Sequence, residues 1–575
     1  MNDIRRSILW VVFGLSMVLI WDKWQIHNGH QPTFFPGSAA TAPAPVPATA
    51  TTPATAGDAS LPSATGSVAA VGESPAGAPA AAAVRHAVST DVLRVVFNSE
   101  GGSVIEAQLT QHAEATLTSK DQDDQPFTLL VQDASRTYVA QTGLIGGSFP
   151  THKTPMTLVP GATTLADGQN ELQVRFESAE VGGVKLVKTY TLTRGRYDIA
   201  VQHEVLNNSE QPVTPQLYLQ LVRDGNKLSS ETPFYSTFTG PAVYTEAQKY
   251  QKVEFEDIEK NKADFVRSTS DGYVAMVQHY FASAWLLGDG VARENFARKI
   301  DSNLYAVGSI TTLPTLAPGQ VQRVDARLFV GPQEEKVLET IAPGLELVKD
   351  YGWLTILAKP LYWLLEKIHG FVQNWGWAIV LLVVLIKAAF YWLNASAYRS
   401  MAKMKAINPR IMEMRERLKG NPQQMQQEMM KMYREEKVNP LGGCFPILIQ
   451  IPVFIALYWV LLSSVEMRNA PWLGWITDLS SPDPYFILTV VMAVSTMIQS
   501  ALISLPPDPL QAKLRWMMPL MFSVMFFFFP SGLVLYWITN NVLTIAQQSY
   551  INNRMGVPLK FTMPFDLFKG KPAAK

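Results

Sequence analysis

The sequence predicts an α-helical polytopic membrane protein of six spans, joined to one large antiparallel β-sandwich that lies outside the membrane. Two observations lead to this fold class. Apolar runs of near-spanning length fill the last third of the chain, and a long series of short β-type segments precedes them. The chain has 575 residues and is 47% hydrophobic, which is more apolar than most soluble proteins of this size.

Composition also limits the classes of function. The formal net charge is zero, so no overall field attracts DNA or another nucleic acid. The single cysteine, Cys444, excludes an intramolecular disulfide and a multi-cysteine metal cluster. The sequence contains no Gly-x-x-x-x-Gly-Lys-Ser/Thr loop, no His-Glu-x-x-His and no Gly-x-Ser-x-Gly motif. We therefore expect no enzymatic activity, no cofactor and no metal.

The N-terminal segment, residues 1–24, is predicted to be a signal anchor and the first span. Arg5 and Arg6 precede an apolar run, which is the charge pattern of a signal sequence or a signal anchor. Residues 21–24 (WDKW) stand where a small-x-small cleavage site would be, so the sequence favours an uncleaved anchor with Met1 in the cytoplasm. Removal at a later Ala-x-Ala is the alternative.

Residues 25–86 are predicted to form a disordered tether outside the membrane. From about residue 36 the chain is almost entirely Ala, Pro, Thr, Gly and Ser, as in "TAPAPVPATATTPATAGDAS". Such a stretch lacks the large apolar side chains whose burial would offset its ordering entropy. We expect it to be semi-extended.

Residues 87–340 are predicted to form the β-sandwich. Strand-like runs flank a Gly-Gly turn in "DVLRVVFNSEGGSVIEAQLT", and two more meet at Arg194-Gly195-Arg196. No long helical pattern interrupts the series before Glu334, which favours one large antiparallel sandwich. Sandwiches of this size often bind sugars, but no cluster of carboxylates with aromatic platforms marks a site, so a structural or docking role is the alternative.

The remaining chain is predicted to be helical. Residues 345–374 form an amphipathic pattern that contains Lys359, Glu366, Lys367 and His369, so we expect a helix at the outer interface. Pro530-Ser531-Gly532 divides a run that is too long for one helix. The five further spans are predicted at 375–393, 442–465, 485–505, 516–530 and 532–551.

Basic residues in the short segments predict the orientation, because cytoplasmic loops carry the excess of Lys and Arg. One connecting loop contains only Arg468 as a basic residue, and we place it outside. Both termini then lie in the cytoplasm. The segments are a cytoplasmic helical hairpin at 394–441, an outer loop at 466–484, a cytoplasmic loop at 506–515 and a basic cytoplasmic tail at 552–575.

Lys387 interrupts the second span, in "WAIVLLVVLIKAAFYWL" from Trp377. It lies about ten residues into the span, hence on the order of 15–18 Å deep at 1.5 Å per residue. The lysine either snorkels to the inner headgroups as an anchor, or it faces a watery cavity, because exposure to lipid would cost roughly 3 kcal/mol or more.

Polar residues in other spans favour the watery cavity. Some of them could simply hold helices together. So many polar groups, with no acidic partner for Lys387, indicate a hydrated interior. They are Gln499 in the fourth span, and Thr539, Asn540, Asn541, Thr544, Gln547 and Gln548 in the last.

Three segments carry a resemblance to a known family. "SMAKMKAINPRIMEMRERL", "EEKVNPLGGCFPILIQIPVF" and "FPSGLVLYWITNN", in this order and spacing, resemble the YidC membrane protein insertases, relatives of the mitochondrial Oxa and chloroplast Albino proteins. The resemblance covers about Tyr351 to Tyr550. An N-terminal anchor followed by a large β domain resembles the Gram-negative branch, which implies the inner membrane with the β domain in the periplasm.

The resemblance implies a five-helix insertase core around a polar groove, which is open to cytoplasm and lipid and closed outside. Nascent membrane proteins would pass through it, alone or beside the Sec translocon, in contact with membrane lipids. The family has an arginine at the position of Lys387, so lysine keeps the charge but loses the bidentate fork. We expect the substrate groove to include Lys387, Gln499, Tyr536, Trp537 and Asn540.

The hairpin is predicted to be two methionine-rich helices broken at Gly420-Asn421-Pro422. Methionine is flexible and polarizable, so it suits apolar partners of varied shape. The hairpin is then either a receptor for hydrophobic nascent segments near the ribosome or an ordinary amphipathic pair with a packed core; the basic tail could also touch the ribosome. The capture residues proposed from the sequence are Met401, Met404, Met412, Met425 and Met429.

A second class of function is a secondary transporter with a periplasmic binding domain. Transporters usually show repeated halves with broken helices and intramembrane acids. The sequence shows neither, and it offers no carboxylate for a proton or sodium site. It therefore favours the insertase.

Overall fold

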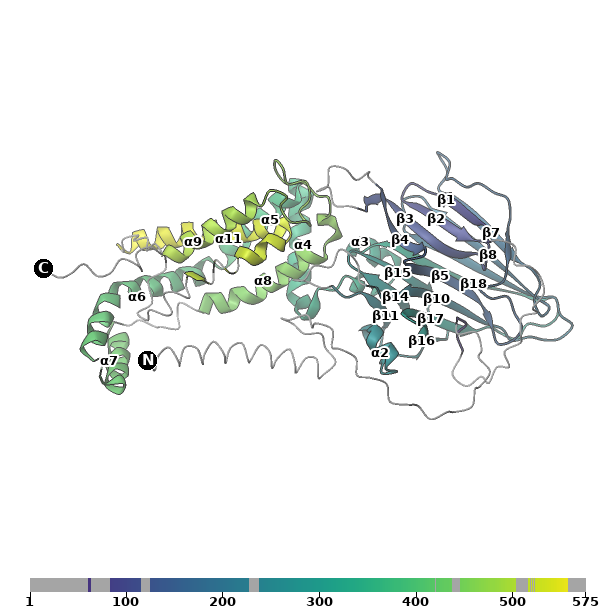
Figure 1. Ribbon diagram of the computed structural model, residues 1–575, viewed down its shortest axis with the longest axis horizontal. Helices are drawn as coiled ribbons and strands as arrows, with labels where there is room; N and C mark the ends of the chain where they lie inside the picture. The colour runs from purple at the N-terminus through teal and green to yellow at the C-terminus, as the bar shows by residue number, and fades with distance from the viewer. Residues whose placement is uncertain are drawn as a thin grey trace.

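The computed structural model describes residues 60–63, 83–114, 125–226, 237–418, 420–436, 445–502, 516–517, 519, 521 and 523–556. A β domain lies at one end of an elongated molecule, a bundle of helices adjoins it, and helices α6 (Tyr391–Arg417) and α7 (Pro422–Glu435) extend to the opposite end (Figure 1). The predicted N-terminal anchor, the loop 506–515 and most of the tether and tail lie outside the described residues.

The β domain contains two nine-stranded sheets in which neighbouring strands are antiparallel, as expected. Across the first sheet, the strands are β1 (Arg85–Ser89), β2 (Leu93–Asn98), β3 (Ser103–Ala113), β4 (Pro126–Gln132), β5 (Thr137–Ile145), β10 (Gln216–Asp224), β17 (Leu304–Thr312), β16 (Arg293–Asp301) and β13 (Ser268–Thr269). Across the second, they are β12 (Lys249–Lys252), β11 (Gly240–Thr245), β14 (Tyr273–Gln278), β15 (Phe281–Leu287), β18 (Val321–Pro332), β9 (Asp198–Asn207), β8 (Val184–Thr193), β7 (Glu171–Ser178) and β6 (Met156–Leu158).

The turns of the domain follow the glycines in the sequence. Gly101 and Gly102 both have positive φ, at 69° and 59°, between β2 and β3. A side chain at Gly101 would collide with the carbonyl oxygen of His152, 2.2 Å from the Cβ position. Gly195 has φ 69° in the turn that joins β8 to β9. Only glycine adopts such conformations freely, so these residues fix where the strands reverse.

The two sheets pack face to face around one continuous core. β7 alternates exposed and buried residues, because one of its faces lies against the other sheet. Two buried polar side chains also join the sheets. The Tyr138 hydroxyl donates to the carbonyl of Met276 at 3.0 Å, and the Trp285 indole donates to the carbonyl of Gln220 at 3.1 Å. Short helices α2 (Phe255–Glu259) and α3 (Glu335–Ile341) complete the domain.

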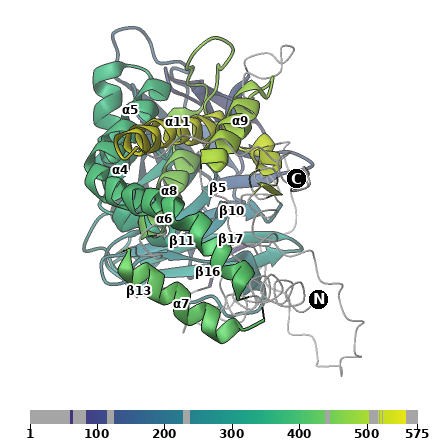
Figure 2. The same ribbon diagram turned by 90° about the vertical axis from the view of Figure 1, so that its left-hand side faces the viewer.

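The helices of the bundle pack side by side beyond the β domain (Figure 2). α4 contacts α5 and α8, and α11 contacts α5, α6 and α9. Their apolar residues form a second buried cluster, separate from the core of the β domain. The elements are η1 (Leu345–Val348), η2 (Gly352–Leu354), α4 (Thr355–Val372), α5 (Trp375–Ala389), α8 (Phe445–Ser463), η3 (Val465–Met467), α9 (Ile487–Leu502), η4 (Phe526–Phe528) and α11 (Ser531–Arg554).

Two helices differ in length from the sequence prediction. The interfacial helix expected at 345–374 begins as two short 3-10 turns and becomes the regular helix α4 only at Thr355. The segment 375–393 is not one helix, because α5 ends at Ala389. Phe390 has φ −90° and ψ 12°, outside the α-helical range, and the axes of α5 and α6 differ by 65°.

Within the described part of the chain, no single helix passes a test of length and hydropathy for crossing a membrane. Helices α5 and α6 pass it together, as a pair bent at Phe390. Residues 450–463 and 487–502 form shorter apolar helices.

A buried ion pair joins the β domain to the bundle. Lys349, which follows η1, has a fully buried side chain, and its Nζ lies 3.1 Å from Oε1 of Glu466 in η3. The hydroxyl of Tyr362 in α4 donates to the same carboxylate. Because a buried charge needs such partners, this cluster stabilises the contact of the chain that follows the β domain with α4 and η3.

Candidate functional site

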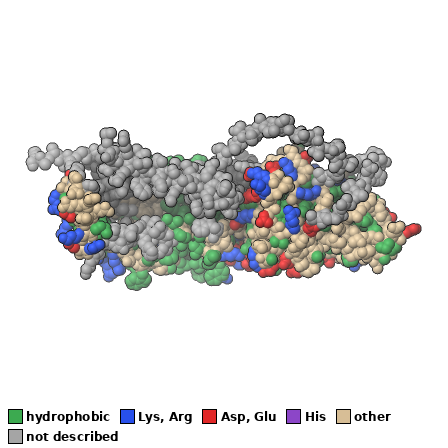
Figure 3. Space-filling view, turned by 90° about the horizontal axis from the view of Figure 1, so that it is seen from below, with side chains coloured by type: hydrophobic (Ala, Val, Ile, Leu, Met, Phe, Trp, Pro, Cys, Tyr) green, Lys and Arg blue, Asp and Glu red, His purple; other side chains and the backbone are tan. Residues whose placement is uncertain are grey.

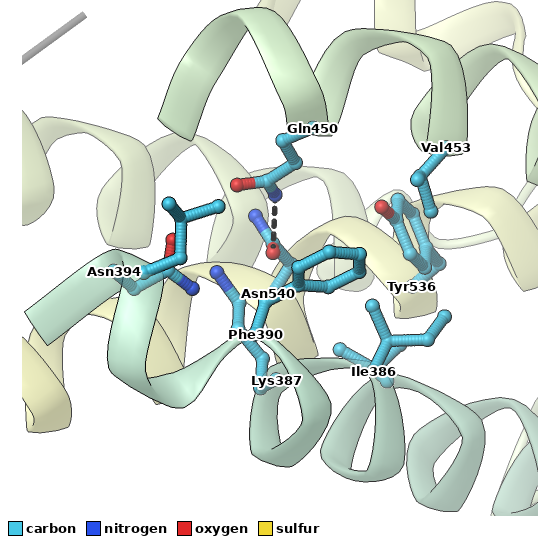
Figure 4. Close-up of a pocket in the computed structure, with 10 residues that line it drawn as sticks. Ile386, Lys387, Phe390, Asn394, Gln450, Val453, Tyr536 and Asn540 are labelled. Atoms are coloured by element: carbon cyan, nitrogen blue, oxygen red, sulfur yellow. Dashed lines mark hydrogen bonds between the residues drawn. The ribbon is translucent and has the colours of Figure 1, made fainter. Parts of the chain in front are cut away.

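A small, partly open pocket lies among four helices of the bundle. Helices α5, α6, α8 and α11 each contribute to its wall, and we call it the central pocket (Figure 4). Its walls are mostly apolar, with four polar side chains turned inward. The lining residues are Val383, Ile386, Lys387, Phe390, Leu393, Asn394, Gln450, Val453, Tyr536 and Asn540.

Lys387 lies in the last turn of α5. Its Nζ donates to Oγ1 of Thr544 in α11 at 2.9 Å. The C-terminal end of a helix carries partial negative charge, which favours a cation there. An ammonium has three donors, so one bond to a hydroxyl leaves it able to bind a further acceptor.

Two side-chain amides of the pocket wall are hydrogen-bonded to each other close to the lysine. Nε2 of Gln450 in α8 donates to Oδ1 of Asn540 in α11 at 2.7 Å, and Figure 4 shows this bond directly above Lys387. Asn394, which is 7% exposed, contributes a third amide from the first turn of α6. The pocket thus combines one cation with amide groups that can donate and accept hydrogen bonds.

The structure brings together some of the residues proposed from the sequence and separates others. Lys387, Tyr536 and Asn540 line the central pocket. Trp537 packs its ring against Phe454, at 4.9 Å between centroids. Gln499 is half-buried on α9 and is not among the lining residues.

The sequence reasoning missed Gln450 and Asn394. A signal was present for Gln450, because it is the only amide in the apolar helix α8. In contrast, Asn541 illustrates the alternative of polar groups that hold helices together. Its amide donates to Ser495 at 3.0 Å and to Thr496 at 2.8 Å, both in α9.

Helices α6 and α7 form the expected pair, with residues 418–421 between them. Ile407 and Ile411 are buried between the helices. Of the proposed capture residues, Met404 and Met429 pack against these isoleucines, Met425 is half-buried and Met412 is 53% exposed. The side chain of Met401 lies outside the described residues. The methionines therefore divide between an internal core and the surface.

Among the residues that the structure describes, no three His, Cys, Asp or Glu side chains gather in a way that could hold a metal ion.

Two family models match the chain. One, described as the YidC periplasmic domain, matches residues 85–364, and one described as a 60Kd inner membrane protein matches residues 367–557. The chain is 56% identical to the membrane protein insertase YidC of Cupriavidus metallidurans over 558 residues, which cover 96% of this chain and 98% of the relative. It is 54% identical to the membrane protein insertase YidC of Burkholderia multivorans over 561 residues, with 96% and 99% covered.

Solved structures give weaker matches. A crystal structure described as an active YidC insertase with its first transmembrane domain resolved matches 81% of this chain and 93% of its own, at 18% identity and a TM-score of 0.37. A putative aldose 1-epimerase from Escherichia coli K12 matches 44% of this chain and 99% of its own, at 9% identity and a TM-score of 0.26. These scores are too low to support an argument about function.

Proposed function

The chain belongs to the YidC family of membrane protein insertases, and from this premise we propose how its helical core inserts clients. Its relatives place it in the inner membrane with a periplasmic domain. In our proposal, the central pocket is a polar groove that accepts the leading segment of a nascent membrane protein. The observation that carries the proposal is Lys387 beside three amides, in a pocket whose other walls are mostly apolar.

The surface of the bundle supports its placement in the bilayer. Hydrophobic side chains gather over the middle of the molecule, between a hairpin end rich in Lys and Arg and a β domain of mixed charge (Figure 3). Exposed apolar side chains also occur on α5 and α9: Leu381, Val384, Leu385, Val490, Val491 and Val494. A continuous exposed apolar surface of this kind suits lipid rather than water.

The proposed topology has six spans, with the hairpin in the cytoplasm. The hairpin lies at the end of the bundle farthest from the β domain, which supports opposite sides of the membrane for the two (Figure 1). A reporter fused after Gly420 should therefore be cytoplasmic, and one fused near Gly474 periplasmic. Finding both on one side would end the six-span arrangement.

The groove would lower the barrier for polar client segments. Lys387 attracts an acidic segment, and the amides replace part of its hydration, so the segment is spared contact with hydrocarbon. Each Leu or Ile of the client that enters lipid contributes about −0.5 kcal/mol. The membrane potential adds about 2.3 kcal/mol per charge per 100 mV for an acidic residue that moves outward.

These terms suffice for short, lightly charged segments and not for large, highly charged domains. We therefore propose that clients with such domains also require the Sec translocon. The comparisons do not favour a secondary transporter, because the matched relatives are insertases.

We propose that the hairpin makes the first contact with hydrophobic client segments near the ribosome. The exposed residues Met412 and Met430 support this role, because they are available to a partner. Replacing both with Gln should reduce crosslinking of a nascent chain to the hairpin. Met432→Gln, within the packed part of the hairpin, should instead loosen the α6–α7 pair.

Substitution of Lys387 tests the groove. Two single-span clients are compared by protease protection, one with acidic residues in its translocated tail and one with these residues neutralised. Lys387→Ala and Lys387→Gln should reduce insertion of the acidic client by roughly tenfold, the equivalent of about 1.4 kcal/mol. They should spare the neutral client. Lys387→Arg should retain activity, because it keeps the charge, and Lys387→Glu should be worst.

The matched control is Lys367→Ala, which removes the same charge from an exposed site on α4, outside the pocket. It should insert both clients normally. If Lys387→Ala inserted both clients as well as the parent protein does, the electrostatic role would fail, and Lys387 would be an anchor that snorkels to the headgroups.

A further inference from the structure

A short part of the predicted tether lies on the β domain. Residues 60–63 are the only residues between 1 and 82 that the structure describes. Pro62 is buried, Leu61 is half-buried and Ser63 is exposed. A stretch expected to be disordered throughout therefore contains a segment with a defined contact.

The contact is made through the backbone of the tether. Nη1 of Arg298 donates to the carbonyl of Leu61 at 2.6 Å, and Nη2 of the same guanidinium donates to the carbonyl of Ser60 at 2.7 Å. Nε2 of Gln220 also donates to the carbonyl of Ser60, at 3.3 Å. Two parallel bonds from one planar fork to consecutive carbonyls fix both the position and the direction of the peptide.

The residues that make this contact share the outer face of the first sheet. Leu219 and Leu221 belong to the core between the sheets, so Gln220 between them points to the opposite face. Arg298 on β16 is opposite Ala306 on β17, which is opposite Val222 on β10. These strands are adjacent, so Gln220 and Arg298 reach one peptide from two sides.

The site is prepared for a ligand. The amide of Gln220, which is completely buried with residues 60–63 in place, is oriented by a second bond, to Oε1 of Gln141 at 2.9 Å. The guanidinium of Arg298 lies over the ring of Phe296, 5.5 Å from its centroid. That ring in turn covers Gly308, where a side chain would collide with it. Arg298 is thus held in place rather than free to rotate, which lowers the entropy cost of binding.

The tether sequence fits this site. Leu61 is the one leucine between residues 36 and 83, and that stretch contains no Ile, Met, Phe, Trp or Tyr. Ser60 lies in a turn and Leu61 in a bend, so the carbonyls of these two consecutive residues can both face the guanidinium of Arg298. Pro62 limits the conformations open to Leu61 before binding, which lowers the entropy cost of docking.

We propose that the outer face of the first sheet is a docking site for the chain's own tether, with residues 60–62 as its occupant. Docking changes the reach of the N-terminal segment. Residues 25–59 extend at most about 120 Å, whereas residues 25–84 would extend at most about 210 Å if the tether left the domain only at β1. The docked segment therefore keeps the N-terminal segment closer to the β domain than the length of the tether requires.

A distance measurement on the full-length protein tests the proposal. Spin labels are attached to Ser63→Cys and Ser302→Cys, both exposed positions, in a Cys444→Ala background. Double electron–electron resonance in detergent or nanodiscs should give one narrow distance distribution. Leu61→Gly combined with Pro62→Gly should broaden the distribution and shift part of it to longer distances. This variant changes no strand, so it cannot act by unfolding the sheet.

Arg298→Ala should broaden the distribution in the same way. Arg323→Ala, which removes an exposed arginine from β18 in the other sheet, should leave it narrow. A broad distribution in the parent protein, or a narrow one that persists in the Leu61→Gly/Pro62→Gly variant, would overturn the proposal. If the distribution broadened only in the Leu61→Gly/Pro62→Gly variant, the tether would still dock at this site, but Arg298 would not be the residue that holds it.

Discussion

Two lysines show how differently the β domain and the helical bundle surround a charged side chain. In the sandwich, Lys188 is completely buried, and its Nζ donates to the carbonyls of Gly101 and Thr142 at 2.6 and 2.7 Å. In the bundle, Lys387 is half-buried, and the hydroxyl of Thr544 is its acceptor among the described residues. The first lysine is enclosed by fixed backbone acceptors, while the second lies beside an open pocket.

This difference in acceptors suggests different roles for Lys188 and Lys387. The acceptors of Lys188 are backbone carbonyls of strand β5 and of the tight turn between β2 and β3, so its bonds stabilise the fold. A side-chain hydroxyl and side-chain amides can rearrange, which is what our proposal requires if the polar groups around Lys387 are to exchange partners with a client. We therefore expect changes in the sandwich to alter stability and changes in the pocket to alter insertion.

The largest expected effect is a pH dependence of the β domain. Burial lowers the pKa of the Lys188 ammonium from 10.5 to about 7. Between these values the unfolded chain holds the proton and the folded domain does not, so stability rises with pH, by up to about 1.4 kcal/mol per unit from pH 7 to 10. Burial lowers the pKa of the neighbouring His203 to about 3, so this imidazole stays neutral in the folded domain over that range.

Pulse proteolysis over a urea series, with the surviving β domain detected at each pH, measures this slope. Lys188→Met should flatten it, because the variant carries no titrating group at that position. An identical slope in the parent protein and the variant would show that another group is responsible. Client insertion should be unchanged.

The next effect is the loss of the two hydrogen bonds that one hydroxyl makes between the sheets. Tyr138→Phe removes the hydroxyl that contacts the carbonyl of Met276 and, at 2.6 Å, Oγ of Ser283. We expect a decrease of roughly 1–3 kcal/mol in the unfolding free energy of the β domain, because buried partners are left without a bond. In Tyr250→Phe, the hydroxyl that is removed is buried with no partner among the described residues, so this control should cost nothing. Equal losses in both variants would contradict the argument.

A smaller effect is expected in the pocket. Gln450→Leu and Asn540→Leu should each reduce insertion of a client with a polar tail, and the double variant should be little worse than either single one. The bond between these amides predicts a coupling of roughly 0.5–1.5 kcal/mol. The stability of the β domain should stay constant. Gln499→Leu is the control, because Gln499 is not among the pocket-lining residues. If the losses of the two single variants simply added up in the double variant, the bond between Gln450 and Asn540 would play no part in insertion.

The smallest effect is expected at Thr544. Thr544→Val removes the acceptor that positions Lys387 and keeps its charge, so insertion of the acidic client should fall about two- to fivefold, or roughly 0.4–1 kcal/mol. Thr539→Val is the matched control, because the Thr539 hydroxyl donates to the carbonyl of Leu535 within its own helix. If both variants behaved alike, the position of Lys387 would not depend on Thr544.

Much of the fold follows from local patterns in the sequence. Gly101, Gly102 and Gly195 reverse the chain because they alone tolerate positive φ there. The alternation in β7 follows from a strand with one buried face. Asn421 and Pro422 start α7, where the asparagine side chain accepts from the backbone N–H of Gln424 and proline at the first helical position costs no hydrogen bond.

The sequence alone therefore determined the class of the molecule, the antiparallel domain and the presence of a cation among apolar residues. Only the tertiary structure decided which residues surround that cation, because Lys387, Gln450 and Asn540 come from three helices far apart in the chain. Tyr536 and Trp537 are neighbours, yet one lines the pocket and the other packs against Phe454. Successive residues on a helix point about 100° apart. The rotation of α11 about its axis therefore decides whether Tyr536 or Trp537 lines the pocket.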